Sequence, residues 1–144
     1  MGSQILAPAA VLVLWSVIMV FWMAGTRLPA MAKLGTDLKT APPGGRGVDL
    51  EGVLPPSVNW KSHNFTHLVE QPTLFYAAVA ILAIAGAGNG LNAQIAWGYT
   101  GLRILHSLWQ SLVNTIPVRF MLFLLSTLCL TALAINAVRV TLAI

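Results

Sequence analysis

The chain has 144 residues, of which 57% are hydrophobic and 8% are charged, and its formal net charge at neutral pH is +4. This composition excludes an ordinary soluble domain, and the length leaves room for one membrane domain of four helices. The eight Lys and Arg residues are spread from Arg27 to Arg139 without forming a basic run, so the charge does not indicate a nucleic-acid partner.

The first predicted element is a membrane-spanning helix over residues 5–26, which contain no charged side chain. At about 1.5 Å per residue this stretch reaches about 33 Å, which is enough to cross the hydrocarbon core. Pro8 falls in the first turn, where proline is tolerated, and Trp22 with Arg27 marks the far interface. A soluble protein rarely contains a helix that is apolar on every side for this length.

Residues 27–63 are predicted to form one long polar loop, because APPGGRG and LPP place turn-forming residues among scattered charges. We expect at most one short amphipathic turn in the first part of this loop. A second span is predicted over residues 64–85, with its polar side chains confined to the first turns. Pro72 should kink this helix and free the carbonyl of Leu68.

Two further spans are predicted over residues 95–113 and 118–143, on either side of a short connection that ends at Pro117. Hydropathy alone leaves the third span doubtful, since it carries Arg103 and His106. With the first two spans, this pattern predicts an all-α integral membrane protein, a four-helix bundle in which residues 1–144 form a single domain.

The basic residues predict the orientation of the bundle. Five of them lie in the predicted first loop: Arg27, Lys33, Lys39, Arg46 and Lys61. Arg119 follows the third connection on the same side, whereas the amino terminus and the uncharged turn at residues 86–94 carry no basic residue. By the positive-inside rule, the long loop faces the cytoplasm and both termini face away from it. Arg139 does not fit this rule.

Polar side chains recur along one face of the third span at spacings of three and four residues: Tyr99, Arg103, His106, Gln110 and Asn114. A second polar row lies on the second span: Asn64, His67 and Glu70. A charge in a bilayer is costly unless it has a partner or a function. We therefore expect Glu70 to pair with Arg103, beside His106.

Two interpretations of these polar rows remain open from the residues alone. The rows either form a network whose only role is to hold the helices together, or they line a polar pocket for an anionic, water-soluble ligand. A metal site built on His63, His67, Glu70 and His106 is a weaker alternative. The spans contain no second matching carboxylate, and Cys129 is the only cysteine, so the preferred interpretation has no metal.

The stretches NFTHLVEQPTLFY and AWGYTGLRILHSLWQSLVNTIPVRF resemble the family of membrane-associated proteins in eicosanoid and glutathione metabolism, MAPEG, particularly its small bacterial members. The most specific part of the resemblance is a fixed spacing of five residues: Arg103, His106, Ser107, Asn114 and Arg119. The resemblance implies a homotrimer in the bacterial inner membrane. It also implies contact with membrane lipid and with a lipophilic substrate, and glutathione bound between subunits in the cytoplasmic half.

The resemblance also implies roles for individual residues. Arg119 would be catalytic and stabilise the glutathione thiolate, and Arg103 would hold a glutathione carboxylate. The other glutathione-binding candidates are Asn64, His67, Glu70, His106 and Gln110. We therefore expect a glutathione-dependent transferase or peroxidase. The alternative is a noncatalytic lipid-binding or scaffolding member, because Phe123 stands where some relatives have a tyrosine.

Overall fold

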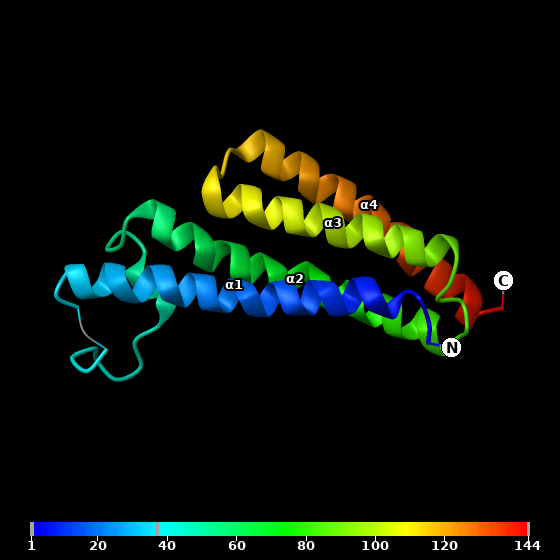
Figure 1. Cartoon of the computed structure of the whole chain (residues 1–144), viewed down its shortest axis with the longest axis horizontal. Helices are drawn as coiled ribbons and strands as arrows, with labels where there is room; N and C mark the ends of the chain where they lie inside the picture. The colour runs from blue at the N-terminus through cyan, green and yellow to red at the C-terminus, as the bar shows by residue number, and fades with distance from the viewer. Residues whose placement is uncertain (1, 37, 144) are drawn as a thin grey trace.

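The computed structural model describes residues 2–36 and 38–143, and this part of the chain is helical and contains no strand (Figure 1). Four long helices and one short 3-10 helix follow in the order α1 (Leu6–Lys33), η1 (Gly47–Leu50), α2 (Pro56–Ile84), α3 (Leu91–Leu112) and α4 (Ile116–Thr141). The predicted all-α helical bundle is confirmed.

Local sequence explains where most of these helices start and stop. α2 begins at Pro56 and α4 has Pro117 in its first turn, where the missing amide hydrogen of proline has no helical partner to lose. α2 ends before Gly86, which takes a positive φ of 73° that other residues rarely adopt. The next connection is short, and α3 runs back along α2.

The predicted loop 27–63 is wrong at both ends, because α1 continues to Lys33 and α2 already begins at Pro56. Contacts between distant segments stabilise these helical extensions. Arg27 donates from Nη2 to the carbonyl of Gly47 at 3.2 Å and to Asn59 Oδ1 at 3.3 Å. Local composition predicts a loop here because it contains no information about such tertiary contacts.

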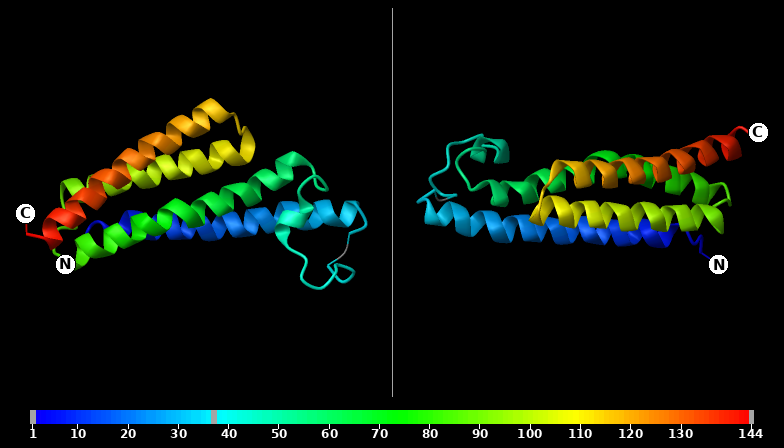
Figure 2. Two further views of the ribbon diagram at one scale, coloured as in Figure 1. Left: turned by 180° about the vertical axis from the view of Figure 1, so that it is seen from behind. Right: turned by 90° about the horizontal axis from the view of Figure 1, so that it is seen from above.

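The helices form two antiparallel pairs, α1 with α2 and α3 with α4, and α2 contacts all three other helices. Figures 1 and 2 show the two pairs lying close together near the chain termini and diverging toward the connection between α3 and α4. Phe75 of α2 stacks on Tyr99 of α3 with ring centroids 4.2 Å apart, within the hydrophobic core. The bundle is therefore closed at one end and splayed at the other.

Three of the described helices, α1, α2 and α4, are long and apolar enough to cross a membrane. Large apolar side chains point away from the bundle on all three, for example Phe21 at 73% exposure and Leu74 at 63%. Such surfaces are suited to contact with lipid. α3 does not meet the same criterion, because the polar residues that it carries lower its hydropathy.

The orientation predicted from the loop charges can be tested by labelling. Both termini lie at one end of the bundle, and the segment between α1 and α2 lies at the other (Figure 1). In a Cys129→Ser background, a membrane-impermeant thiol reagent added outside intact cells should label Asn89→Cys and leave Gly45→Cys unlabelled. Labelling of Gly45→Cys from outside would contradict the predicted orientation.

Candidate functional site

The polar face of α3 points into the bundle. Seven consecutive members of this face are buried: Tyr99, Thr100, Arg103, His106, Ser107, Gln110 and Ser111. The prediction that these side chains avoid lipid is confirmed. The helix is thus polar on the inside, where hydrogen-bond partners are available from the neighbouring helices.

Ser107 is the centre of a hydrogen-bond network that joins three helices. Its Oγ accepts a hydrogen bond from Trp15 Nε1 of α1 at 2.9 Å and one from Asn64 Nδ2 of α2 at 2.7 Å. Asn64, which the sequence predicts as a glutathione-binding residue, is fully buried inside the subunit and is not exposed at an open surface. The sequence did not indicate Trp15, which looks like an ordinary lipid-facing residue of an apolar span.

Arg103 is completely buried, and its partner is not the predicted one. Its Nη2 donates to the carbonyl oxygen of His67 at 2.6 Å, one residue before the Leu68 carbonyl that Pro72 was expected to free. Its Nε and Nη1 have no hydrogen-bond partner among the residues that the structure describes.

The expected ion pair between Glu70 and Arg103 is wrong, since the described residues include no salt bridge between them. The Glu70 side chain is 61% exposed and lies 3.6 Å from His67 Nδ1. It projects from the outer face of α2, which makes solvent or a neighbouring molecule its natural partner. Helical spacing placed Glu70 at the right depth but not on the face that meets α3.

A cavity of about 190 Å³ brings three predicted site residues together, His67 of α2, His106 of α3 and Arg119 of α4. It lies at the splayed end of the bundle, beside the connection between α3 and α4. The rings of His67 and His106 meet edge to face with centroids 5.9 Å apart. One cation and two imidazoles therefore line a single hollow, which we call the α4 entry pocket.

The rest of the α4 entry pocket is apolar and is formed by Ile116, Phe120 and Phe123. These residues follow the helical spacing of four and three residues, so they share one face of α4 with Arg119. Phe123 approaches His106 with ring centroids 6.4 Å apart. In the sequence, Phe123 stands out only as a departure from relatives. Ile116 and Phe120 were not predicted as site residues, although their spacing around Arg119 contained the signal.

Asn114 holds Arg119 in place. Its Oδ1 accepts a hydrogen bond from Arg119 Nη1 at 2.6 Å, across the connection between α3 and α4. The backbone of Asn114 has a φ of 59°, a left-handed conformation that asparagine tolerates better than most residues. The same residue thus ends α3 and orients the guanidinium at the start of α4.

Gln110 and Arg103 do not line the α4 entry pocket, although each lies within a turn of His106 on α3. In the described part of the chain, neither the Oε1 of the buried Gln110 nor the Oδ1 of the buried Asn64 has a hydrogen-bond partner. The bundle therefore contains several buried polar atoms whose hydrogen-bonding capacity is not used among the described residues.

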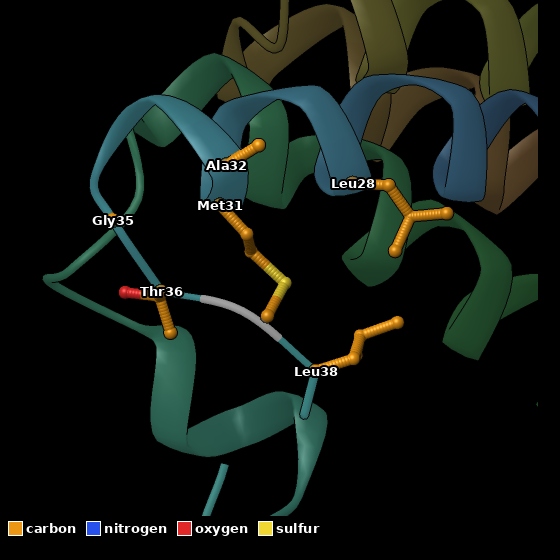
Figure 3. Close-up of a pocket in the computed structure, with 6 residues that line it drawn as sticks. All are labelled: Leu28, Met31, Ala32, Gly35, Thr36 and Leu38. Atoms are coloured by element: carbon orange, nitrogen blue, oxygen red, sulfur yellow. The ribbon is translucent and has the colours of Figure 1, made fainter. Parts of the chain in front are cut away.

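Other hollows carry less chemistry. The cavity in Figure 3, about 510 Å³ at the end of α1, is lined by Leu28, Met31, Ala32, Gly35, Thr36 and Leu38, none of them titratable. Across residues 2–36 and 38–143, no three His, Cys, Asp or Glu side chains gather in an arrangement that could hold a metal ion. Among the cavities in the described part of the chain, the α4 entry pocket is thus the one that brings predicted site residues together.

Comparison with known proteins settles the family. The model of the MAPEG family matches residues 5–139, nearly the whole chain. The chain belongs to the MAPEG family. The same comparisons found no matching curated protein and no matching solved structure. This MAPEG protein is therefore a membrane protein of a family associated with glutathione and eicosanoid metabolism, and its own activity has to be argued from its residues.

The role of Asn114 in this MAPEG protein can be tested with two substitutions. Asn114→Ala removes the hydrogen bond to Arg119 and strains a left-handed backbone, and should lower the free energy of unfolding by about 1–3 kcal/mol. Asn114→Gly removes the same hydrogen bond but keeps the backbone conformation, so it should cost less. Thermal unfolding of both variants in detergent measures the difference. Equal stability of the wild type and both variants would show that the hydrogen bond between Asn114 and Arg119 does not stabilise the fold.

Proposed function

We propose that this MAPEG protein is a membrane-embedded, glutathione-dependent transferase or peroxidase that acts on lipophilic electrophiles, with glutathione as the thiol co-substrate. The observation that carries the proposal is the α4 entry pocket, in which Arg119 faces His67, His106 and a wall of Phe120 and Phe123. A fixed cation beside an apolar surface suits a reaction between a polar thiol and an apolar partner.

Arg119 is the proposed catalytic residue. A free thiol is mostly protonated at neutral pH, and only the thiolate attacks an electrophile efficiently. A guanidinium stays charged at every relevant pH and lies here in the first turns of α4, where the helix dipole adds positive potential. In a transferase reaction the thiolate sulfur forms a bond to an electrophilic carbon, and the leaving group departs with the bonding electron pair.

Peroxide reduction uses the same thiolate. The sulfur attacks one peroxide oxygen, the O–O bond breaks, and the other oxygen leaves as an alcohol after it takes up a proton. A second glutathione then displaces water from the oxidised sulfur and yields the disulfide. Phe120 and Phe123 would contact the apolar part of the electrophile in either reaction.

The proposed glutathione site extends beyond the α4 entry pocket. A volume of about 190 Å³ is below the usual range of about 300–1,000 Å³ for small-molecule sites, so one subunit provides only part of a site for a tripeptide. The exposed carboxylate of Glu70 can accept from an ammonium group. Arg103 is buried outside this pocket, so its two unpartnered nitrogens would reach a glutathione carboxylate only where the ligand enters the bundle beside His106. Asn64 and Gln110 are buried and do not line the pocket, so we assign them a supporting role and no direct contact with glutathione.

A homotrimer is proposed on the same grounds, because a neighbouring subunit can complete the site and cover part of the apolar surface. Native mass spectrometry in several mild detergents should show a dominant species of three chains. Bound glutathione should shift the distribution further toward that species, since a ligand shared between subunits stabilises the assembly. A dominant monomer or dimer in all detergents would contradict this proposal.

We further propose that all four helices cross the bacterial inner membrane as one domain, with α3 shielded by its neighbours and the α4 entry pocket in the cytoplasmic half. The buried polar face of α3 supports its inclusion, because a helix surrounded by other helices does not need to be apolar on every side. A cytoplasmic pocket also has access to a water-soluble thiol.

One feature favours a noncatalytic, lipid-binding or scaffolding role as the second candidate. Half of the lining of the α4 entry pocket is apolar, and Phe123 offers no hydroxyl where some relatives have a tyrosine. Such a pocket can hold a lipid chain without activating a thiol.

The wild-type protein decides between the two functions. Millimolar glutathione should raise its thermal unfolding temperature, and the protein should accelerate glutathione attack on an aryl halide or the reduction of a lipid hydroperoxide. Ophthalmate, a glutathione analogue without the thiol, should stabilise the protein comparably and support no turnover. Binding without turnover on several electrophiles would favour the noncatalytic role, and absence of binding would exclude the enzymatic proposal.

A further inference from the structure

Arg119 can stabilise a glutathione thiolate, but it cannot take up the proton that the thiol loses. A guanidinium is fully protonated at every relevant pH and has only hydrogen-bond donors. Another group has to accept this proton. The α4 entry pocket contains two imidazoles, His67 and His106, and imidazole is the side chain that most often accepts a proton near neutral pH.

His67 is arranged as the base of a histidine–carboxylate pair. Its Nδ1 lies 3.6 Å from Oε2 of Glu70, one turn later on α2, which is within ion-pair range when the ring is protonated. A carboxylate beside Nδ1 favours the tautomer that carries its proton on Nδ1 and leaves Nε2 free to accept. Among residues 2–36 and 38–143, no hydrogen bond of the His67 ring is observed.

His106 is less suited to this role. The residue is 2% exposed, whereas the His67 side chain is 40% exposed, so a proton on His106 has no direct route to water. The guanidiniums of Arg103 and Arg119 are near it, and no carboxylate pairs with it in the described part of the chain. Both guanidiniums repel a protonated His106, whereas Glu70 stabilises a protonated His67.

The charged and titratable groups around His67 come from three helices. Glu70 and His63 lie on α2 itself, Arg103 of α3 donates to the His67 carbonyl at 2.6 Å, and Arg119 of α4 lines the same pocket. Glu70 favours the protonated ring and the guanidiniums oppose it. The ring is therefore able to take up a proton and to give it back, as a group that acts first as base and then as acid must do.

We propose that His67 is the general base that removes the thiol proton of glutathione, with Glu70 as its positioning residue. This inference rests on the proposed glutathione-dependent function. In conjugation to an aryl chloride, the S–H bond breaks, its electron pair stays on sulfur, and the proton moves to Nε2 of His67. The sulfur then forms a bond to carbon, and chloride leaves with the bonding pair. The exposed ring finally releases the proton to water.

Peroxide reduction uses the same proton a second time. The sulfur forms a bond to one peroxide oxygen, and the O–O bond breaks with its electron pair on the other oxygen. The Nε2–H of His67 then protonates this leaving oxygen, so the step releases no proton to water. Conjugation thus needs His67 only as a base, whereas peroxide reduction needs it as a base and as an acid.

This difference is tested with the full-length protein, glutathione, chlorodinitrobenzene and cumene hydroperoxide. At neutral pH, His67→Gln should lower kcat for both substrates about 100-fold. At high pH, where bound glutathione ionises without a base, conjugation should recover while peroxide reduction stays slow. The matched control is His63→Gln, which removes an imidazole one turn earlier on α2. His63 contacts Glu51 at 2.6 Å and does not line the pocket, so both rates should stay unchanged.

Two further variants test the pair. Added imidazole should restore activity to His67→Ala and have no effect on His63→Ala. Glu70→Gln should lower kcat about fivefold in the wild type and not at all in a His67→Gln background, because Glu70 acts on the reaction through His67. A carboxylate accepts at both oxygens, so an ammonium group bound by Glu70 would change KM in both backgrounds and not kcat in one.

The outcomes separate this inference from the function on which it rests. An active wild type together with an active His67→Gln, or a loss in His67→Gln that is equal for both substrates at every pH, overturns the role of His67 and leaves the proposed function intact. A wild type that neither binds nor turns over glutathione removes both. If the His67 variants fail to fold, Glu70→Gln at its exposed position still decides, since an unchanged kcat for both substrates overturns the pair.

Discussion

Arg119→Ala is expected to lower kcat for glutathione conjugation about 100-fold or more while the dissociation constant of glutathione changes by less than about threefold. The guanidinium stabilises the thiolate, which is the reactive form, and contributes little to binding the protonated thiol. Single-turnover kinetics and calorimetric titration separate the two effects. Arg46→Ala, which removes a guanidinium from the exposed segment between α1 and α2, serves as the matched control.

The way in which Arg119 variants lose rate and glutathione affinity distinguishes stabilisation of the thiolate from simple positioning of glutathione. If Arg119 acts on the thiol, the variant should recover part of its rate at high pH, where solvent deprotonates bound glutathione without help. Arg119→Lys keeps the charge but loses the planar donor set that Asn114 orients, so an intermediate rate is expected. Equal losses of kcat and glutathione affinity in Arg119→Ala would show that the residue is a binding group.

The inward face of α3 could be predicted from the sequence because helical periodicity is a local property. Residues three and four apart share a face regardless of what surrounds the helix, so the burial of Arg103, His106 and Gln110 followed from spacing and the cost of charge in lipid. The partner of each side chain did not follow from spacing. That partner depends on how the helices rotate and splay.

Glu70 illustrates this limit. The sequence gives its depth along α2 but not the rotation of α2 about its axis, and a rotation of a few tens of degrees decides whether a side chain meets α3 or faces outward. Packing determines that rotation, with Phe75 stacked on Tyr99 at a centroid distance of 4.2 Å. The carboxylate is consequently exposed, and Arg103 contacts a backbone carbonyl.

The helical ends around the first loop could not be predicted for a related reason. Prolines, glycines and charges indicate a loop when they are considered alone, yet Pro29 lies inside α1 and Pro56 opens α2. The contacts of Arg27 with Gly47 and Asn59 join residues 20 and 32 positions apart. A contact of this range is a property of the folded chain and leaves no local signature.

The geometry of Arg103 changes the result expected from its removal. If Arg103 were an internal ion-pair partner that holds the bundle together, its loss would destabilise the protein by about 3–5 kcal/mol. Within the described residues, the guanidinium is instead buried, forms no salt bridge and leaves two nitrogens without a hydrogen-bond partner. Burial of an incompletely paired cation opposes folding, and under the proposed function a glutathione carboxylate would supply the missing partner.

Arg103→Met, which keeps length and apolar packing, should therefore leave the free energy of unfolding without ligand within about 1 kcal/mol of the wild type. It should weaken glutathione binding about 10- to 100-fold, because a charge-assisted hydrogen bond to a carboxylate contributes about 1.5–3 kcal/mol. Tyr99→Phe, one turn away on α3, is the matched control. It removes the hydrogen bond to Gln71 at 3.3 Å and should cost about 1 kcal/mol of stability without changing glutathione affinity. A large loss of stability in Arg103→Met together with unchanged affinity would assign Arg103 to the scaffold and leave the glutathione carboxylates to other residues.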